Sequence, residues 1–551
     1  MQWFEDHGDI DRALAHATLT GDPALGMAVL EKGGGWRLIY RSFRGGGPLF
    51  RAIAETAAGI DLPAFPLTTL GLAIFQAKAG QIRAAGHYLR IVETTADPAN
   101  IGPARQIRVV RALLSLYSDR TLSLADLSEL KADLTAERDF GEVHRGLVLN
   151  LLSYNYLART ELERAIVYGE LAFRCLQDSG AFFGAMHQHI HVGQAAFFAG
   201  NTVLAEETYA RVITDAQTHM GPGCDLDAIG QVLMAELRIH RGEWAEGTRA
   251  LDWALAHVDR HDAWFDIFAA GFLSRQSVAL IHGDLNGAQA AISEARRWAQ
   301  RRGFERLRRL VEGGQARLLL AAGSPAEAGA WATKSGLSQD GVSPRPTTDL
   351  LFGLRGSVPA MFWVRFWLAS GHPGRARTAL NALLTVKPHR LHVPQRIEVD
   401  LLNLRVMLAE GRIDPAAALL SALVLEVPVE DFRATFLIEA PKLMADLRAV
   451  AGAAGTAGLV MARLDAIAAG PTVLVPTVAD HSADPAQSDL TQRDQSVLHL
   501  IAAGNTNKQV CQQLALTENT VKFHLRNIFA KLAVNTRTGA ISAARQLGIL
   551  G

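Results

Sequence analysis

The sequence predicts an all-α protein in which a superhelix of helical hairpins is followed by a small helical domain. Two observations predict this class. Helix-like segments recur with a period of about 40 residues between about 65 and 430, and a different helical pattern follows a Pro- and Ala-rich segment at 470–488. Hydrophobic residues make up 49% and charged residues 20% of the chain, which is a globular composition.

Residues 1–64 are predicted to form helical hairpins shorter than those that follow. Gly8 and Gly21 are each followed five residues later by a small residue, and GGGWRLIYRSFRGGG at 33–47 indicates a helix between two loops. None of these glycines is followed by the Lys-Ser or Lys-Thr pair of a phosphate-binding loop. We therefore predict no nucleotide site here.

Residues 65–430 carry the 40-residue period. A turn residue, usually glycine, ends one helix-like segment, and a small residue follows five positions later. Glycine just past a helix end adopts the left-handed conformation without a Cβ clash, and the small residue lets the returning helix approach closely. The registered pairs are Gly80 with Ala85, Arg120 with Ala125, Thr160 with Ala165, Gly200 with Ala205, Gly242 with Gly247, Gly283 with Ala288, Gly323 with Ala328, Gly371 with Ala376, and Gly411 with Ala416.

Such hairpins bury both faces only when neighbours stack, so we predict a tetratricopeptide-like superhelix over 65–430, with two terminal helices at 431–469. We call these two ranges together the solenoid. An all-helical bundle with coincidental glycine spacing is the alternative, and the regular register argues against it. Segment 470–488 is predicted to be an interdomain linker.

Residues 489–551 are predicted to form a separate domain of four helices. Thr491 caps the first helix, with Asp494 three positions on, and Gly504 ends it. A short second helix follows at about 508–514, and Thr517 caps a third. Thr536 is predicted to cap the fourth helix, which runs to about Leu547. A short helix, a tight turn and a longer helix form a helix-turn-helix unit.

The third predicted helix, at 516–532, has two different faces. At about 100° per residue, one face is apolar and is predicted to be buried; it holds Val521, Leu525, Ile528 and Leu532. The opposite face holds Asn519, Lys522, Phe523 and Arg526. A solvated face does not favour an exposed Phe beside two cations, whereas a face in the DNA major groove uses cations and apolar groups together. A plain solvated face is the alternative.

Charge is distributed unevenly along the chain. Lys plus Arg and Asp plus Glu both number 55, so the whole protein has no net attraction to nucleic acid. From 488 to the end, however, seven basic residues stand against three acidic ones. The basic surface is therefore predicted to be concentrated in the C-terminal domain.

The C-terminal residues closely resemble a LuxR-type helix-turn-helix domain. The matching marks are Leu490-Thr491-x-Arg493, Gly504, Asn507-Lys508, Leu514, Thr520-Val521-Lys522-x-His524, Asn527-Ile528, Lys531-Leu532 and Arg537. The chain departs from this pattern at Asp494, where Glu is usual, at Ala533, where Gly is usual, and at Phe523, where many relatives have a smaller residue.

The resemblance implies which residues bind DNA. It places Lys522, Phe523 and Arg526 at base-contacting positions, and Asn507, Lys508, Thr517 and Thr520 where backbone phosphates are held. The predicted DNA-binding set is Asn507, Lys508, Thr517, Asn519, Thr520, Lys522, Phe523, Arg526, Lys531 and Arg537.

The solenoid resembles the sensor of the MalT-like branch of these regulators, and WFEDHGDIDRALAHATLTGDPALGMAVLE resembles the segment after the ATP-binding module of that branch. That module is not encoded in this chain, so we expect a natural short form, a truncation, or regulation without ATP. The predicted function is a transcriptional activator that binds promoter DNA as a homodimer and senses a small-molecule or protein signal. RNA polymerase is the partner implied by the family.

The alternative function is a peptide- or protein-binding scaffold whose C-terminal domain only docks. An enzyme is the least favoured class, because no Ser-His-Asp, paired-carboxylate or Cys-His arrangement is supported by spacing. We predict no cofactor, and we predict no residues for the signal site. Four aromatic side chains on one helix are predicted to pack between repeats, with a ligand-stacking role as the alternative; they are Phe362, Trp363, Phe366 and Trp367.

The pairs His187 with His191 and His257 with His261 have helical metal-ligand spacing, but no third ligand is indicated, so we predict no metal site. The cysteines lie far apart without CxxC spacing, which indicates reduced thiols in a cytoplasmic protein. The acidic N-terminus lacks the order of a signal peptide, and no apolar run of about 18 residues predicts a membrane span.

Overall fold

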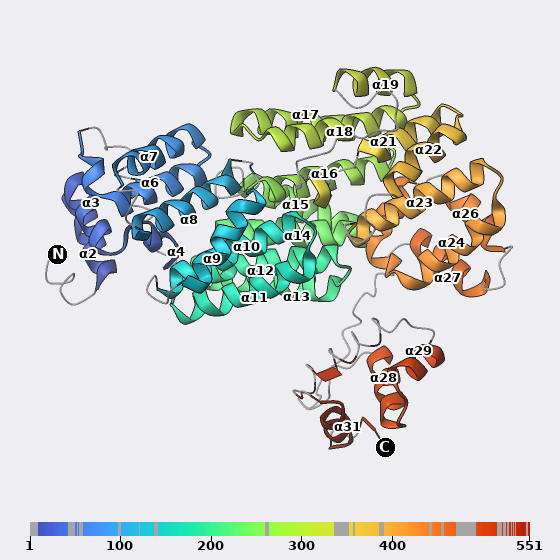
Figure 1. The fold of residues 1–551 in the computed structure, drawn as a ribbon. Helices are drawn as coiled ribbons and strands as arrows, with labels where there is room; N and C mark the ends of the chain where they lie inside the picture. The colour runs from blue at the N-terminus through green and yellow to red at the C-terminus, as the bar shows by residue number, and fades with distance from the viewer. Residues whose placement is uncertain are drawn as a thin grey trace. The chain divides into compact units, whose positions relative to one another are not determined.

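The fold is given by a computed structural model of the full chain (Figure 1). It describes residues 9–41, 50, 51, 53, 59–96, 101–118, 120, 122–136, 141–258, 264–335, 352–355, 359–384, 391–439, 443–452, 457–469, 492–514, 521, 525, 528, 529, 532, 534, 536–546, 549 and 550. The chain divides into two compact units, the first of residues 1–423 and 427–471 and the second of residues 424–426 and 472–551. The predicted linker lies outside the described residues and stays a prediction.

The first unit is built of antiparallel helical hairpins that follow one another along the chain (Figure 1). Their helices are α6 (Pro66–Lys78) with α7 (Ile82–Thr95), α8 (Ile101–Tyr117) with α9 (Leu124–Ala136), α10 (Glu142–Ala158) with α11 (Leu162–Asp178), α12 (Phe182–Phe198) with α13 (Thr202–Met220), α14 (Asp225–Arg241) with α15 (Trp244–Val258), α16 (Phe265–Ile281) with α17 (Leu285–Arg302), α18 (Glu305–Ala321) with α19 (Pro325–Lys334), α21 (Pro359–Ala369) with α22 (Pro373–Leu384), and α23 (Val393–Ala409) with α24 (Ile413–Glu426). The predicted all-α, tetratricopeptide-like class is confirmed.

The turns of these hairpins explain the register that the sequence shows. Gly200 has a φ of 86°, and Thr160, which replaces glycine at the equivalent turn, has a φ of 59°. The amide of Thr160 donates to the Leu157 carbonyl at 3.0 Å, and the amide of Glu161 donates to the Tyr156 carbonyl at 3.0 Å. These bonds satisfy carbonyls at the end of α10, which offsets the strain of a left-handed threonine.

The small residues that follow the turns are buried, as predicted, except in one copy. Ala85, Ala165 and Ala205 have no exposed surface. Ala125 is exposed instead, and α9 buries Leu127. The prediction for this copy is therefore wrong, because α9 begins at Leu124 and presents a different face to its neighbour.

Shorter helices precede the hairpins. They are α2 (Ile10–Thr20), α3 (Pro23–Lys32), η1 (Gly35–Arg37), α4 (Leu38–Arg41) and η2 (Leu62–Ala64). The helix predicted within 33–47 is represented in the described residues by η1 and α4. Trp36 of η1 is fully buried, and its indole N–H donates to the Gln106 side chain at 3.0 Å, which ties this segment to α8.

Further helices follow the last hairpin, and their number differs from the prediction. The segment after η5 (Val429–Phe432) contains α25 (Arg433–Glu439), α26 (Leu443–Gly452) and α27 (Ala457–Ala469). The sequence predicted two terminal helices, whereas the described part of 431–469 contains three α-helices, of which the seven-residue α25 is the shortest. Its Ala434 and Phe436 are buried, so α25 is held by packing rather than by a long amphipathic pattern.

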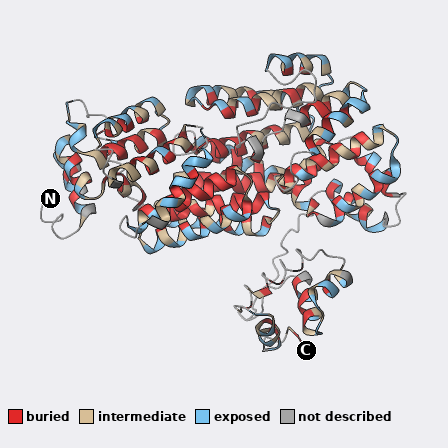
Figure 2. Ribbon diagram, in the orientation of Figure 1, coloured by how far each residue is buried: buried red, intermediate tan, exposed pale blue. Residues whose placement is uncertain are grey.

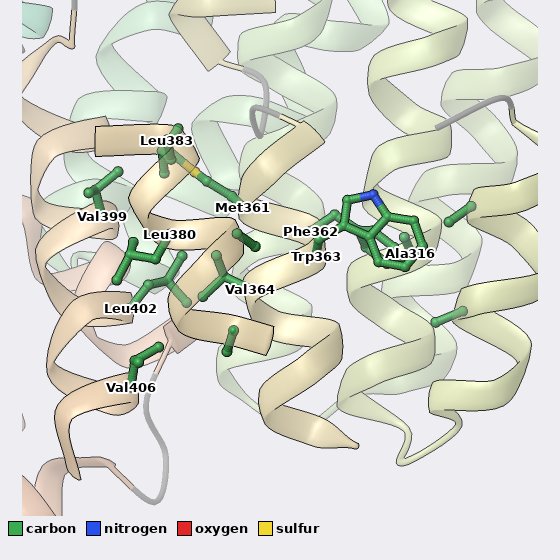
Figure 3. Close-up of a cluster of buried hydrophobic side chains, with 14 residues drawn as sticks. Ala316, Met361, Phe362, Trp363, Val364, Leu380, Leu383, Val399, Leu402 and Val406 are labelled. Carbon is green, nitrogen blue, oxygen red and sulfur yellow. The ribbon is translucent and has the colours of Figure 1, made fainter. Parts of the chain in front are cut away.

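Buried residues occur along the helices of the first unit (Figure 2). One cluster joins α21 to α18, α22 and α23, and Figure 3 shows Met361, Trp363 and Leu380 within it. Phe362 and Trp363 are 7% and 5% exposed, and Trp363 stacks on Trp367 at 6.1 Å between ring centroids. The four aromatic side chains therefore pack between repeats, as the sequence predicted.

A buried group of charges links helices that are distant in the chain. The Glu439 side chain, 2% exposed, accepts from the guanidinium groups of Arg365, Arg317 and Arg405. Although burial alone would raise the pKa of this carboxyl, the three arginines hold it well below its usual range. The group therefore joins α18, α21, α23 and α25 through charges that compensate one another.

In the described part of the chain, no helix is both long and apolar enough for a membrane crossing.

Candidate nucleic-acid interface

Within residues 472–551 of the second unit, the first described helix is α28 (Gln492–Ala502), whose buried face is the predicted one. Val497 and Leu498 have no exposed surface, and Ile501 is 1% exposed. Gly504 ends the helix with a φ of 86°, and the amide of Asn505 donates back to the Leu500 carbonyl at 3.1 Å. The predicted extent and stop of this helix are confirmed.

The apolar face predicted within 516–532 is buried. Val521 and Ile528 have no exposed surface, and Leu525 and Leu532 are 8% and 7% exposed. All four belong to one cluster with residues of α28 and of α31 (Arg537–Gln546). The prediction that these four side chains point inward together is confirmed. A helix with this buried face turns the opposite positions away from the core.

A reciprocal cap begins the short helix α29 (Asn507–Leu514). The amide of Thr506 donates to the Gln509 side-chain oxygen at 2.8 Å, and the amide of Gln509 donates to the Thr506 hydroxyl at 3.4 Å. This is a capping box, and its signal, Thr-x-x-Gln, stands in the sequence but was not used in the prediction. Thr536 caps α31 as predicted, since its hydroxyl accepts from the amide of Gly539 at 3.0 Å.

Arg537 joins the start of α31 to the turn between α28 and α29. One terminal nitrogen, Nη1, donates to the Asn507 side-chain oxygen at 3.3 Å. The other, Nη2, donates to the Ile501 carbonyl at 3.4 Å and also to the Asn505 carbonyl. Its guanidinium is thus committed to groups within the unit. We call this set of contacts the Arg537 clamp.

The predicted DNA-binding residues divide into two groups. Within the described residues, Lys508 is exposed on α29, while Asn507 and Arg537 are half-buried and bonded to each other. The structure brings these two together and adds Thr506 and Gln509 beside them. The remaining predicted residues lie outside the described part of the chain: Thr517, Asn519, Thr520, Lys522, Phe523, Arg526 and Lys531.

Histidines of the first unit lie among aromatic rings. The His191 ring lies 5.6 Å from that of Trp264, and burial lowers the pKa of His191 to about 3, so the imidazole is neutral. His187 lies 6.0 Å from the same indole. His257 stacks on Trp253 at 4.1 Å, and His261 lies outside the described residues. In the part of the chain that is described, no group of three or more His, Cys, Asp or Glu is placed to hold a metal ion.

A comparison of sequences identifies the C-terminal region. Residues 488–544 match the family of bacterial regulatory proteins called the luxR family. These residues are a LuxR-family domain. The helices and the buried face described above belong to it. The luxR match confirms the family resemblance of this domain, while the resemblance of the solenoid to the MalT-like branch stays a prediction.

One relative shares the LuxR-family domain. The HTH-type transcriptional regulator AlkS of Alcanivorax borkumensis is 44% identical over 64 residues, which cover 12% of this chain and 7% of that regulator. The chain therefore matches only a small part of this relative's length. Among solved structures, yeast Tom70 is similar over 81% of this chain and 95% of its own length, at 12% identity and a TM-score of 0.32.

Proposed function

We propose that this protein is a DNA-binding transcriptional regulator that recognises promoter DNA through its LuxR-family domain. The observation that carries the proposal is the buried face of Val521, Leu525, Ile528 and Leu532 within a domain that matches this family. A helix buried along one side leaves its other side for a partner. In a helix-turn-helix unit that partner is the major groove.

Roles follow for the residues on the other side of that helix. Lys522, Phe523 and Arg526 contact base edges, where a guanidinium can pair with guanine and an apolar ring can touch a thymine methyl. Asn519 lies on the same predicted stripe. Contacts to backbone phosphates come from Thr517, Thr520 and Lys531, together with Asn507 and Lys508, and Arg537 supports them by holding the Asn507 side chain. The exposure of Lys508 at the start of α29 supports this role.

A second part of the proposal concerns the assembly and its control. A single domain with seven basic and three acidic residues binds DNA weakly, so a homodimer presents two recognition helices to successive major grooves. The solenoid senses a small-molecule or protein signal and controls whether two domains can meet. The output is activation through contact with RNA polymerase, as in the branch that the solenoid resembles.

Binding of the full-length protein to duplex DNA tests the proposal. A binding site is first selected from random-sequence duplexes, and the affinity is then measured across a range of salt concentrations. Lys522→Ala should lower the log–log salt slope by about one if Lys522 contacts phosphate. Arg526→Ala should cost about 1–3 kcal/mol at the selected site if it reads a guanine. Lys334→Ala, at an exposed lysine of α19, is the matched control and should change neither.

Two results would contradict this assignment. The first is full-strength binding of the selected site by the double variant Lys522→Ala with Arg526→Ala. The second is no retention of any duplex at low salt by the wild-type protein, which would favour the scaffold function instead. An unchanged slope with a lost base preference would support the base contact proposed for Lys522, whereas a slope lowered by about one would make Lys522 a phosphate contact instead.

A further inference from the structure

The first unit contains a cavity of about 120 Å³ whose walls come from two distant stretches of the solenoid. Helices α12, α14, α16 and α18 form one side, and α23 and α25 form the other. The four-residue helix α20 (Phe352–Arg355) contributes Leu354 and Arg355. The cavity therefore lies where residues more than a hundred positions apart in the chain meet.

The charged groups that line the cavity are already paired. The Arg355 guanidinium donates from Nε and Nη2 to the two oxygens of Glu236 at 2.7 and 2.8 Å, and the two side chains are 5% and 6% exposed. The same guanidinium lies 5.0 Å above the ring of Phe198. Across the cavity, Nη2 of Arg317 in α18 donates to Glu398 in α23 at 3.2 Å. A ligand with a net charge would have to break one of these pairs or remain buried without a counter-charge.

Uncharged polar residues also line the cavity. They include Ser274, Ser277, Thr435 and His240. Nδ1 of His240 is buried and has no hydrogen-bond partner among the described residues. Apolar walls stand beside these groups and are formed by Phe198, Ile239, Leu273, Leu354 and Ile438. Hydroxyls and an imidazole beside apolar walls suit an uncharged ligand that can both donate and accept hydrogen bonds.

We propose that this cavity is the signal-binding site of the solenoid, and that its ligand is a small uncharged molecule with an apolar body and a hydroxyl, carbonyl or amide group. This inference rests on the proposed function, because it assigns a site to the signal that the regulator senses. The cavity volume is close to the roughly 150 Å³ of a protein cavity that binds benzene. The ligand is thus about the size of a single six-membered ring.

The position of the cavity explains how such a ligand could act. It would contact α14 and α16 on one side and α23 and α25 on the other, so it favours the arrangement in which these helices lie together. Helix α25 is followed in the chain by α26 and α27, and then by the segment that leads to the LuxR-family domain. Occupancy of the cavity is thereby linked to the C-terminal end of the solenoid.

Fluorine NMR of the full-length protein tests the inference with four probes that share one ring. Para-fluorobenzyl alcohol and para-fluorobenzamide are uncharged, para-fluorobenzoate is an anion, and para-fluorobenzylamine is a cation. We expect saturable binding of at least one uncharged probe, with the charged probes at least tenfold weaker.

Three variants locate the binding. Ser277→Phe fills the cavity and should weaken binding of the uncharged probe at least tenfold. Ser118→Phe adds the same bulk at another partly buried serine, which lines a separate groove, and should leave binding unchanged. If Ser277→Phe does not fold, Ser277→Ala removes only the hydroxyl and should weaken binding of the alcohol by about fivefold.

Any of three results would overturn the inference: no saturable binding of an uncharged probe to the wild type, equal binding of its charged counterpart, or undiminished binding by the Ser277 variants. The same protein is assayed for promoter DNA. If the protein binds DNA but none of the uncharged probes, only the assignment of the cavity is wrong. Loss of DNA binding by the wild type removes the proposed function itself.

Discussion

Replacing Arg537 with alanine or lysine separates two roles for this residue. The family resemblance places Arg537 among the DNA contacts, whereas the structure commits its guanidinium to the Asn507 side chain and to two carbonyls at the end of α28 and the following turn. A lysine keeps the charge but lacks the planar guanidinium group, so its single ammonium group cannot bond to all of these acceptors at once. The Arg537 clamp therefore predicts that both substitutions damage the LuxR-family domain.

The size of the damage follows from the contacts. A hydrogen bond to a charged group contributes roughly 1.5–3 kcal/mol to stability. Arg537 is only half-buried, so solvent screening weakens its three hydrogen bonds. We therefore expect their combined loss to lower the free energy of local opening by about 2 kcal/mol. Such a loss corresponds to about thirtyfold faster amide exchange, since about 1.4 kcal/mol is a factor of ten.

Hydrogen exchange of the full-length protein, read by mass spectrometry, measures this effect. Peptides that cover α28 and α29 should lose protection in both Arg537→Ala and Arg537→Lys, while peptides from α10 to α13 remain unchanged and serve as the internal control. The reasoning fails if Arg537→Ala keeps wild-type protection and only lowers the salt slope of DNA binding by about one. That outcome would make Arg537 a phosphate contact.

Three further predictions concern other buried groups. Ile528→Ala should cost about 2–5 kcal/mol of stability in the LuxR-family domain, because this side chain is fully buried. The expected result is that the variant no longer binds DNA while the melting transition of the solenoid is unchanged. Glu439→Gln should destabilise the solenoid by about 3–5 kcal/mol, since Arg317, Arg365 and Arg405 lose the charge of the carboxylate that they share; a thermal midpoint equal to that of the wild type would refute this. Burial and then the Glu142 carboxylate raise the pKa of Cys175 to about 12, so its thiol stays protonated at pH 8. Iodoacetamide should label it more slowly than in the urea-unfolded chain and faster in Glu142→Gln, as peptide mass mapping will show.

Residues close together in the chain largely determined the elements of this protein. A hairpin turn needs one residue that adopts a positive φ and one small residue on the returning helix, and both needs are met within five positions, as at Gly200 and Ala205. The buried face of Val521 and its partners is likewise a matter of local helical periodicity. The Thr506–Gln509 cap was equally local and could have been predicted from its spacing.

Other features depended on which distant segments meet, and local patterns do not carry that information. The exposure of Ala125 reflects where α9 begins and which face its neighbours cover. Arg355 is separated from Glu236 by 119 positions, and Arg365 from Glu439 by 74. An arginine has the same sequence signature whether it contacts a phosphate or oxygens of its own domain, as Arg537 illustrates.

The sequence alone thus determined the helical class, the register of the repeat and the LuxR-family character of the tail, because each depends on spacing within one or two helical turns or on a local motif. Only the tertiary structure decided that Arg537 clamps the turn before α29 and that paired charges line a cavity between α14 and α23. The physical reason is that the burial and pairing of a charge depend on partners that folding brings from elsewhere in the chain.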